Sequence, residues 1–488
     1  MSAQNDMLDM PATQLKPGLR HYDELPGPRG IPLLGNALQI EASRFHQQLE
    51  HWCREYGPFF KLQIGNRKVL VVGDHQAVAS VLRDRPDGFR RTSRLEEIWT
   101  EMGLPLGVFA ANGEVWQRQR RMVMAGFDPA HVRRYFPALQ TVSQRLVGRW
   151  QLAAQGGVAI DLQSDLMRYT VDTIAGLAFG AQVNTLDSDD DAIQHHLNKI
   201  FPALFKRVLA PVPLWRFVRS GADRQLARSI AEVNVAVAGF VKQARGRLQA
   251  DPALREHPRN LLEVMIVAAD EPGSGIDDKQ VAGNVLTMLL AGEDTTANTV
   301  AWMIHLLWRN PRVLARAIDE VRRVVADAEN PAFDQVSRLS YVEACAHETM
   351  RLKPVAPILP LQTLRPTVIG DVQVPAGIIV NSLMRRDSVS DGHLPHAAAF
   401  EPERWLAEGE PGALANAARR ISMPFGAGPR ICPGRYLALL EMKMAMAALL
   451  GNFDIESVET PDGQEAREQL AFTMAPVGLR MRLRTLRS

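Results

Sequence analysis

The cysteine in the most distinctive chemical setting is Cys432, within the segment Pro424–Gly434. This segment is rich in glycine and proline, which interrupt both helices and strands, so we expect a rigid loop that presents one thiol. An apolar helical pattern begins at Arg435, which places the thiol at a helix N-terminus. The unpaired N–H groups there favour a negative charge, and the thiolate is the form of cysteine that binds metals. A small buried apolar residue is the alternative for an isolated cysteine.

A second unusual stretch lies inside the longest helical pattern, residues 277–309. Asp277 and Gln280 form a capping box at its start, and Asn310-Pro311 ends it. Its centre reads Ala291-Gly292-Glu293-Asp294-Thr295-Thr296. Glycine, aspartate and threonine are poor helix formers, and a local rule broken in this way often marks a functional site.

Two shorter patterns are ambiguous when each is taken alone. Trp116 and Arg120 are four positions apart, so they share one helix face and could form a cation–π pair. Glu348 and Arg351 are three positions apart, as in an ordinary helical ion pair.

Taken together, these segments resemble the cytochrome P-450 family. The motif Phe-x-x-Gly-x-Arg-x-Cys-x-Gly of its haem-binding loop is matched by Phe425, Gly428, Arg430, Cys432 and Gly434. The resemblance implies haem b (iron protoporphyrin IX) as the cofactor, with the thiolate of Cys432 as the axial iron ligand. It also implies that Arg430 contacts a haem propionate.

The other motifs acquire roles through the same resemblance. Trp116 and Arg120 would bind the propionates, for which a guanidinium suits a carboxylate well. Ala291 and Gly292 would leave room for dioxygen at a kink of the distal helix, Thr295 would donate it a hydrogen bond, and Asp294 would assist proton delivery. A structural network would join Glu348, Arg351 and Arg404. Arg365 is the nearest further candidate for a propionate and is left unassigned.

Composition sets the remaining bounds. The 488 residues are 46% hydrophobic and 23% charged, with a net charge of +2, which gives no electrostatic case for nucleic acid. Of three cysteines, Cys53 and Cys345 fall in helical patterns and are expected to be buried fillers. No signal peptide and no run of about 18 apolar residues is present, so we expect a soluble, cytoplasmic monomer without a membrane anchor. The excess of arginine over lysine is compatible with a bacterial source.

The expected fold is mainly α, the cytochrome P-450 fold. Residues 1–24 are predicted to be a flexible N-terminal segment, and residues 25–488 a single large helical haem domain with a small β region. The haem would lie between the long distal helix and the cysteine loop. A hairpin is expected at 59–64 and 68–72, helices from 74 to about 360, and short strands within 378–384 and 471–486.

The implied function is a haem-thiolate monooxygenase that inserts one oxygen atom from O2 into a hydrophobic organic substrate by hydroxylation or epoxidation. Since no glycine-rich dinucleotide motif is present, we expect a separate ferredoxin- or flavodoxin-type electron donor with its NAD(P)H reductase. The alternatives are a peroxide-driven peroxygenase or isomerase of the same fold, against which Asp294-Thr295 argues, and a non-catalytic haem gas sensor. The predicted substrate-pocket walls are mostly aliphatic, without an obvious charged anchor, and lie at Leu104–Phe109, Val285–Gly292, Val355–Ile358 and Phe472–Met474.

Overall fold

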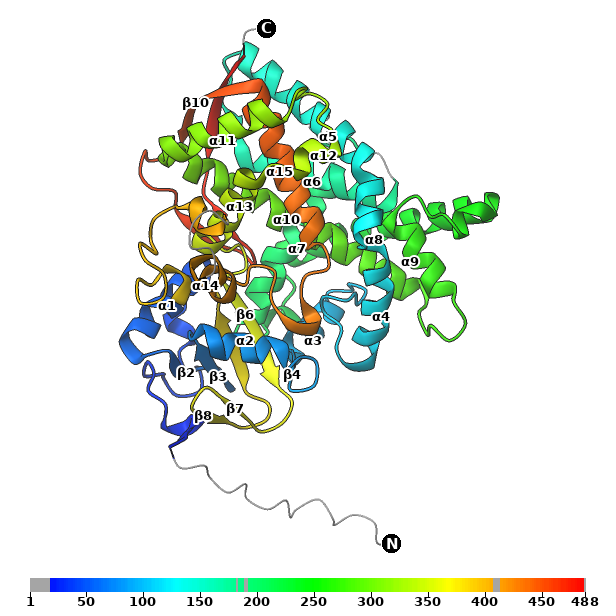
Figure 1. Cartoon of the computed structure of the whole chain (residues 1–488). Helices are drawn as coiled ribbons and strands as arrows, with labels where there is room; N and C mark the ends of the chain where they lie inside the picture. Colours follow the sequence, from blue (N-terminus) through cyan, green and yellow to red (C-terminus); the bar gives the residue numbers. More distant parts are fainter. Residues whose placement is uncertain (1–17, 181–182, 188–191, 407–412, 487–488) are drawn as a thin grey trace.

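The chain folds into a large helical part beside a smaller β-rich part (Figure 1). The computed structural model describes residues 18–180, 183–187, 192–406 and 413–486. Strands from the N-terminal region and from the region around residue 370 lie together at the lower end of Figure 1, although hundreds of residues separate them. The mainly α fold with a small β region that the sequence predicts is confirmed.

The helices have the following bounds: α1 Phe45–Tyr56, α2 His75–Arg83, α3 Ser93–Glu101, α4 Gly113–Gly126, α5 Pro129–Gln155, α6 Leu162–Phe179, α7 Ala192–Leu209, α8 Gly221–Ala250, α9 Leu261–Asp270, α10 Asp278–Arg309, α11 Pro311–Val324, α12 Phe333–Ser337, α13 Ser340–Leu352, α14 Ala413–Ile421 and α15 Arg435–Asn452.

The strands have the following bounds: β1 Arg20–His21, β2 Phe59–Ile64, β3 Arg67–Val72, β4 Phe89–Arg91, β5 Ile160–Asp161, β6 Ile358–Thr363, β7 Thr367–Ile369, β8 Val372–Val374, β9 Ile379–Leu383, β10 Phe453–Glu459, β11 Glu468–Leu470, β12 Met474–Pro476 and β13 Arg480–Thr485.

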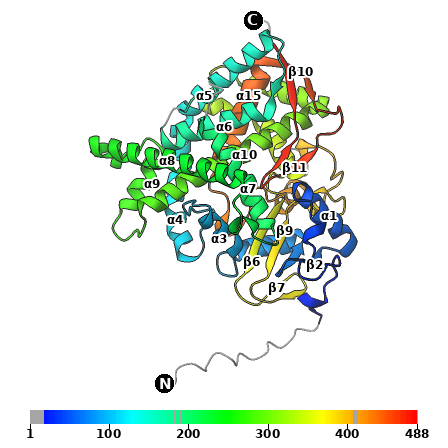
Figure 2. The same ribbon diagram turned by 180° about the vertical axis from the view of Figure 1, so that it is seen from behind.

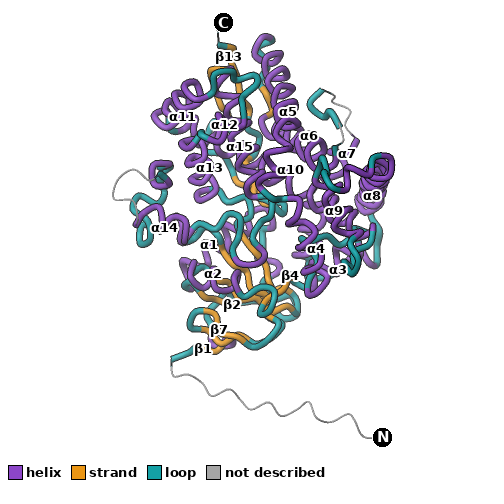
Figure 3. Tube along the Cα trace, turned by 45° about the vertical axis from the view of Figure 1, so that its right-hand side comes forward, coloured by secondary structure: helices purple, strands orange, loops and turns teal. Residues whose placement is uncertain are grey.

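The largest sheet has the strand order β2-β3-β9-β6-β4. The predicted hairpin is confirmed as the antiparallel pair β2–β3, in which Ile64 faces Arg67. Strand β3 then pairs in parallel with β9, Val69 opposite Ile379, so a distant part of the chain completes the sheet. Smaller sheets have the orders β1-β8-β7, β10-β13-β5 and β11-β12. Figure 3 shows that strands gather at both ends of the molecule, with helices between them.

Part of the predicted flexible N-terminal segment is ordered. Strand β1 pairs in parallel with β8, and Arg20 forms an ion pair with Asp371 at 2.8 Å. Tyr22 is only 3% exposed. An aromatic ring buried in this way fixes the chain against the sheet, so residues 20–24 belong to the folded body. Residues 1–17 of the predicted segment lie outside the described residues.

Helix α10 runs through the middle of the helical part, as Figure 2 shows from behind. It packs against α6, α8, α13 and α15, and most of its side chains are buried on all sides. The predicted capping box is present, because Asp277 accepts a hydrogen bond from the Gln280 N–H and Gln280 accepts one from the Asp277 N–H. The helix is continuous through residues 291–296. A buried central helix of this kind gives a rigid wall to any site built along it.

Candidate active site

The cysteine loop is fixed by its backbone. The Cys432 N–H donates to the carbonyl oxygen of Phe425 at 2.9 Å, which closes the loop before α15. Gly426 and Gly428 adopt φ values of +74° and +70°, which favour glycine. A Cβ atom on Gly428 would lie 2.7 Å from the Cα atom of Arg83, so α2 packs directly on the loop. The cysteine loop is therefore held between α2 and α15.

Burial raises the pKa of the Cys432 thiol, against the lowering effects of a backbone hydrogen bond at Gly434 and of the nearby Arg120 and Arg435. The sequence led us to expect that the helix N-terminus would favour the thiolate. Burial therefore opposes the thiolate that the helix N-terminus favours. A bound metal cation deprotonates a coordinating thiol, so the thiolate would form together with the iron bond.

Four arginines gather around the cysteine loop: Arg85, Arg91, Arg120 and Arg430. Arg120 donates to the carbonyl oxygen of Ile431, and Arg430 donates to those of Val108 and Ala111. Arg85 donates to the carbonyl oxygen of Ala427 at 3.3 Å. Within the described residues, none of the four forms an ion pair with a carboxylate.

The electrostatics of this arginine cluster favour the binding of an anion. Burial lowers the pKa of Arg430 to about 8, and Arg91, Arg85 and Arg120 lower it further by repulsion. Burial and repulsion from Arg85 likewise lower the pKa of Arg91 to about 9, and the Arg91 Nε atom is buried without a partner. Desolvated cations that repel one another are costly unless an anion is bound. The cluster therefore fits a group with two carboxylates, as haem has.

Helix α4 brings Trp116 and Arg120 to the same place. Trp116 is 5% exposed, and its ring stacks under the guanidinium of Arg430 at 4.7 Å. The cation–π partner of Trp116 is thus Arg430 from the cysteine loop, rather than Arg120 on its own helix. The structure brings all three of these predicted residues together.

The predicted distal residues lie at the centre of α10. Ala291 is exposed although Leu290 beside it is only 2% exposed, so the helix faces a hollow there. Thr295 lines the same hollow, and its hydroxyl donates to the carbonyl oxygen of Ala291 at 2.8 Å. Gly292 has a different reason to be glycine: its Cβ would lie 2.7 Å from the side chain of Ile174, which lets α6 pack closely.

Asp294 has a buried carboxyl group that contacts the C-terminal region. Its Oδ2 atom accepts a hydrogen bond from the Thr473 hydroxyl at 3.2 Å, and burial raises the pKa of Asp294 to about 6. A carboxyl group with this pKa exchanges protons readily near neutral pH. Thr473 belongs to one of the four predicted wall segments, so α10 and the C-terminal region meet at this carboxyl group.

A cavity of about 200 Å³ lies beside Ala291 and Thr295. Its lining draws on all four predicted wall segments, through Phe109, Leu290, Ala356, Ile358 and Phe472 among others. Sequence analysis missed the contribution of α7, which supplies the following residues: Phe201, Phe205, Val208 and Leu209. The rings of Phe201 and Phe472 stack at 4.4 Å, which gives the cavity an aromatic wall.

Charged residues also line this cavity, contrary to the aliphatic lining expected from the sequence. They are Arg67, Arg91 and Arg94. Arg67 donates to the carbonyl oxygens of Val208 and Ala210 at the end of α7, and Arg94 donates to that of Arg207. Arg67 and Arg94 are therefore occupied in holding α7, while Arg91 belongs to the arginine cluster.

The predicted structural network is present. Arg351 binds both oxygens of Glu348, at 2.8 and 2.7 Å, and Arg404 binds Glu348 Oε1 at 2.9 Å. Trp405, which the sequence did not indicate, donates to Glu348 Oε2 at 2.8 Å. Arg365, in contrast, has a side chain 61% exposed and pairs with Asp84 at the surface.

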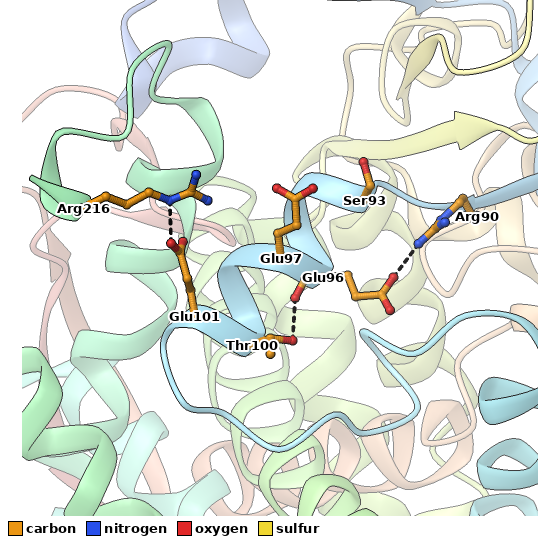
Figure 4. Close-up of a pocket in the computed structure, with 7 residues that line it drawn as sticks. All are labelled: Arg90, Ser93, Glu96, Glu97, Thr100, Glu101 and Arg216. Carbon is orange, nitrogen blue, oxygen red and sulfur yellow. Dashed lines mark hydrogen bonds and ion pairs between the residues drawn. The ribbon is translucent and has the colours of Figure 1, made fainter.

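A separate polar hollow lies on the outer side of α3 (Figure 4). Four of its charged residues form ion pairs, Arg90 with Glu96 and Arg216 with Glu101, each at 2.5 Å. Glu96 also accepts a hydrogen bond from the Asn112 side chain, which in turn accepts one from Arg430 at 3.3 Å. Glu96 and Asn112 thus connect this hollow to Arg430 of the arginine cluster through hydrogen bonds. The hollow and the apolar cavity have no lining residue in common.

Comparison with known proteins defines the class. The family model for cytochrome P450 matches residues 25–482, and the chain belongs to this family. The family implies a haem-thiolate iron, which the arginine cluster and Cys432 fit. Within the described residues, no helix is long and apolar enough to cross a membrane.

Individual relatives are distant. A self-sufficient cytochrome P450 monooxygenase of Aspergillus niger is 26% identical over 474 residues, which are 95% of this chain and 43% of the relative. The carotene epsilon-monooxygenase of Arabidopsis thaliana is 27% identical over 450 residues, 87% of this chain and 78% of the relative. The chain thus spans less than half the length of the fungal relative. Fungal and plant relatives give no support to the bacterial source expected from composition.

Proposed function

We propose that this chain is a haem-thiolate monooxygenase that inserts one oxygen atom from O2 into a hydrophobic organic substrate. The observation that carries the proposal is the cluster of desolvated arginines around the thiol of Cys432, which lacks a carboxylate partner in the described part of the chain. Membership of the cytochrome P450 family, and monooxygenases among the relatives, support the same activity.

In this proposal haem b is the cofactor, and it supplies the activation of dioxygen when bound. Cys432 would be its axial ligand, and Arg430, Trp116 and Arg120 would bind its propionates. Phe425 and Gly434 would shape the loop around the thiolate. We add Arg85 and Arg91 to the proposed propionate-binding residues, because both lie close enough to Arg430 to repel its charge.

The distal residues would handle protons and substrate. Thr295 presents a hydroxyl to the cavity, and Asp294, bound to Thr473, would exchange protons with solvent. The aromatic and aliphatic lining of the cavity favours a hydrophobic substrate. The acid–threonine pair favours use of O2 over a peroxide-driven reaction or gas sensing.

The electron donor is proposed to be a ferredoxin- or flavodoxin-type protein with its NAD(P)H reductase. The fungal relatives are described as self-sufficient, so a donor fused to the haem domain is the second candidate. The mass of the protein purified from its natural source separates the two, because a fused donor would belong to the same polypeptide as the haem domain and a separate donor would not. The monomeric state and the cytoplasmic location remain predictions from the sequence.

The thiolate assignment has a direct test. We expect the reduced haem protein with carbon monoxide to show the strongly red-shifted Soret band of thiolate ligation, and Cys432→Ser to abolish it. Cys53→Ser and Cys345→Ser are matched controls, because both cysteines are buried, at 1% and 0% exposure, and should leave the band intact. A Cys432→Ser variant that keeps the band would disprove the assignment.

The activity test uses the same preparation. With a surrogate donor, NADPH and O2, we expect oxygenated product from a ligand that shifts the Soret band, and label from ¹⁸O2 in that product. Product formed with hydrogen peroxide but not with the donor would favour the peroxygenase alternative. Absence of product under both conditions, with normal carbon monoxide binding, would favour a sensor.

A further inference from the structure

Two histidines and one aspartate converge at a place remote from the cysteine loop in the sequence. They are His75, Asp387 and His393. His75 is the first residue of α2, Asp387 opens the turn that follows β9, and His393 lies in the loop beyond it. One potential ligand atom from each residue lies within 4.8 Å of the other two. Within the described residues, this is the one such group of three histidine, cysteine or acidic side chains.

The separations suit a small divalent cation. His75 Nδ1 lies 2.9 Å from Asp387 Oδ2, and His393 Nε2 lies 3.6 Å from Asp387 Oδ1. Zinc binds imidazole nitrogen and carboxylate oxygen at about 2.0–2.2 Å in a tetrahedron, whose ligand atoms are then about 3.3 Å apart. The two measured separations lie on either side of that value. The rings of His75 and His393 meet edge to face, with centroids 4.9 Å apart, so both can turn a nitrogen toward the carboxylate.

The surroundings hold the carboxylate and leave one side open. The backbone N–H of His75 donates to Asp387 Oδ2 at 2.8 Å. This bond fixes the orientation of the carboxylate, as hydrogen bonds around the ligands do in metal sites. The Asp387 side chain is 2% exposed, that of His75 is 16% exposed and that of His393 is 34% exposed. A cation would therefore reach the site past His393, where water can complete its coordination.

One neighbour opposes a cation. Arg386 Nη1 lies 2.5 Å from Asp387 Oδ1, so the guanidinium competes for the same oxygen. The Arg386 side chain is 31% exposed and can turn toward solvent when a cation arrives. Arg386 would thus lower the affinity for a cation by competing for Asp387, without being a ligand itself.

We infer that His75, Asp387 and His393 form a binding site for a divalent cation of the zinc type, independent of the haem. Two imidazoles and one carboxylate are the ligand set that zinc shares with other late transition ions. The bound ion would join the start of α2 to the segment after β9. Since α2 packs on the cysteine loop through Arg83, the ion would also support the loop from behind.

Calorimetric titration of the untagged, haem-loaded, chelator-treated protein with Zn²⁺ tests the inference. We expect one site per chain and a raised unfolding temperature in the presence of Zn²⁺. His393→Ala should weaken binding at least about tenfold, a loss typical of disturbed metal sites. The matched control is His195→Ala, because His195 and His196 are likewise adjacent histidine rings but lie on α7.

The arginine provides a second variant with the opposite expectation. Arg386→Ala removes the competing cation and should tighten Zn²⁺ binding, while the reduced carbon monoxide spectrum confirms that each variant is folded. The inference is overturned if the stoichiometry and affinity of His393→Ala equal those of the parent protein, or if His195→Ala loses the site instead. Weaker binding in Arg386→Ala would equally contradict it.

Discussion

The two neighbouring threonines of α10 differ in what their hydroxyls face. Thr295 lines the cavity, whereas Thr296 is 2% exposed and its side chain forms a hydrogen bond with the buried carboxyl of Glu441. A step of 100° around the helix separates them. Thr295 therefore contributes to the cavity, whereas Thr296 contributes to the packing of α10 on α15.

We predict that Thr295→Ala binds haem and substrate normally but consumes NADPH with little product, releasing hydrogen peroxide. Loss of a positioned proton-transfer group typically slows its step by about 10²–10⁴-fold. Thr296→Ala should instead remain coupled and lose about 1–3 kcal/mol of stability, because the Glu441 carboxyl loses its partner. Peroxide yield and urea unfolding measure the two effects. A coupled Thr295→Ala, or an uncoupled Thr296→Ala, would reverse the assignment.

Asp294 gives a pH-dependent prediction. Burial raises the pKa of Asp294 to about 6, above the value of about 3.9 in an unfolded chain, so the folded protein favours the neutral carboxyl group. The product-formation rate should therefore change near pH 6, and Asp294→Asn should remove that inflection while still accepting the Thr473 hydrogen bond.

The raised pKa of Asp294 costs stability once pH rises above about 4, and the cost reaches its full size above pH 6. Asp294→Asn should thus gain stability relative to the parent as pH rises from 4 through 6. If the product-formation rate of Asp294→Asn kept the pH profile of the parent protein, Asp294 would be excluded from proton delivery.

Local spacing explains which site residues the sequence revealed. Arg430 and Cys432 are two residues apart, and Trp116 and Arg120 are one helical turn apart, so each pair is visible as a short motif. Arg85 and Arg91 carry no such pattern, and they meet Arg430 only because the chain returns from more than 300 residues away. Burial, which raises the pKa of Cys432, was likewise not visible in the motif, because it depends on the whole fold and not on the helix end alone.

At the scale of elements, the loop between α3 and α4 links the distal helix to the arginine cluster. The Val108 N–H donates to the side chain of Asn284 on α10 at 2.8 Å, and the Val108 carbonyl oxygen accepts from Arg430 at 3.1 Å. A Cβ atom on Gly283 would lie 2.6 Å from the carbonyl oxygen of Leu106. The absence of a side chain at Gly283 thus allows the loop to reach α10.

Gly283→Ala should therefore push the loop away from α10, cost about 1–3 kcal/mol of stability and weaken haem retention. Gly239→Ala is the matched control, because Gly239 also lies within a helix, α8, but its Cβ would meet nothing within 4 Å. The control should gain about 0.5–1 kcal/mol from the smaller entropy of its unfolded chain. Urea unfolding and haem transfer to apomyoglobin measure both variants, and equal behaviour would show that Gly283 is not required for the contact.

Elements with a strong local signal were predicted well. The 277–309 helix has a long apolar pattern and a capping box, and the β2–β3 hairpin has alternating residues around a tight turn. Strands β4 and β6 were missed, because they lie next to or within a stretch that reads as helical. They pair only with each other and with β9, which follows later in the chain. Such pairing depends on partners that no local window contains.

At the scale of the whole molecule, Glu468 of β11 connects four distant segments. It binds His46 of α1 at 2.8 Å, Lys353 after α13 at 2.9 Å and Arg385 after β9 at 2.6 Å. Arg385 also pairs with Glu50 of α1 at 2.8 Å. The Glu468 side chain is 5% exposed and that of Arg385 is 10% exposed, so this network is a buried connection between the helical part and the largest sheet.

Glu468→Gln tests whether this network holds the two parts together. Burial opposes the charge of Glu468, but hydrogen bonds from His46 and Arg385 outweigh it and hold the pKa of Glu468 far below its usual range. A carboxylate with a depressed folded pKa stabilises the protein above its unfolded pKa of about 4.3, and the effect is lost as pH falls below that value. Since Glu468→Gln leaves Lys353 without its carboxylate and leaves Arg385 with Glu50 alone, we expect a loss of about 3 kcal/mol at pH 7 that shrinks below pH 4.3. Glu465→Gln is the control: the Glu465 side chain is 57% exposed and its variant should change stability by less than about 0.5 kcal/mol. Urea unfolding followed by circular dichroism measures both, and equal losses, or a Glu468 effect that grows as pH falls, would show that the network does not stabilise the fold.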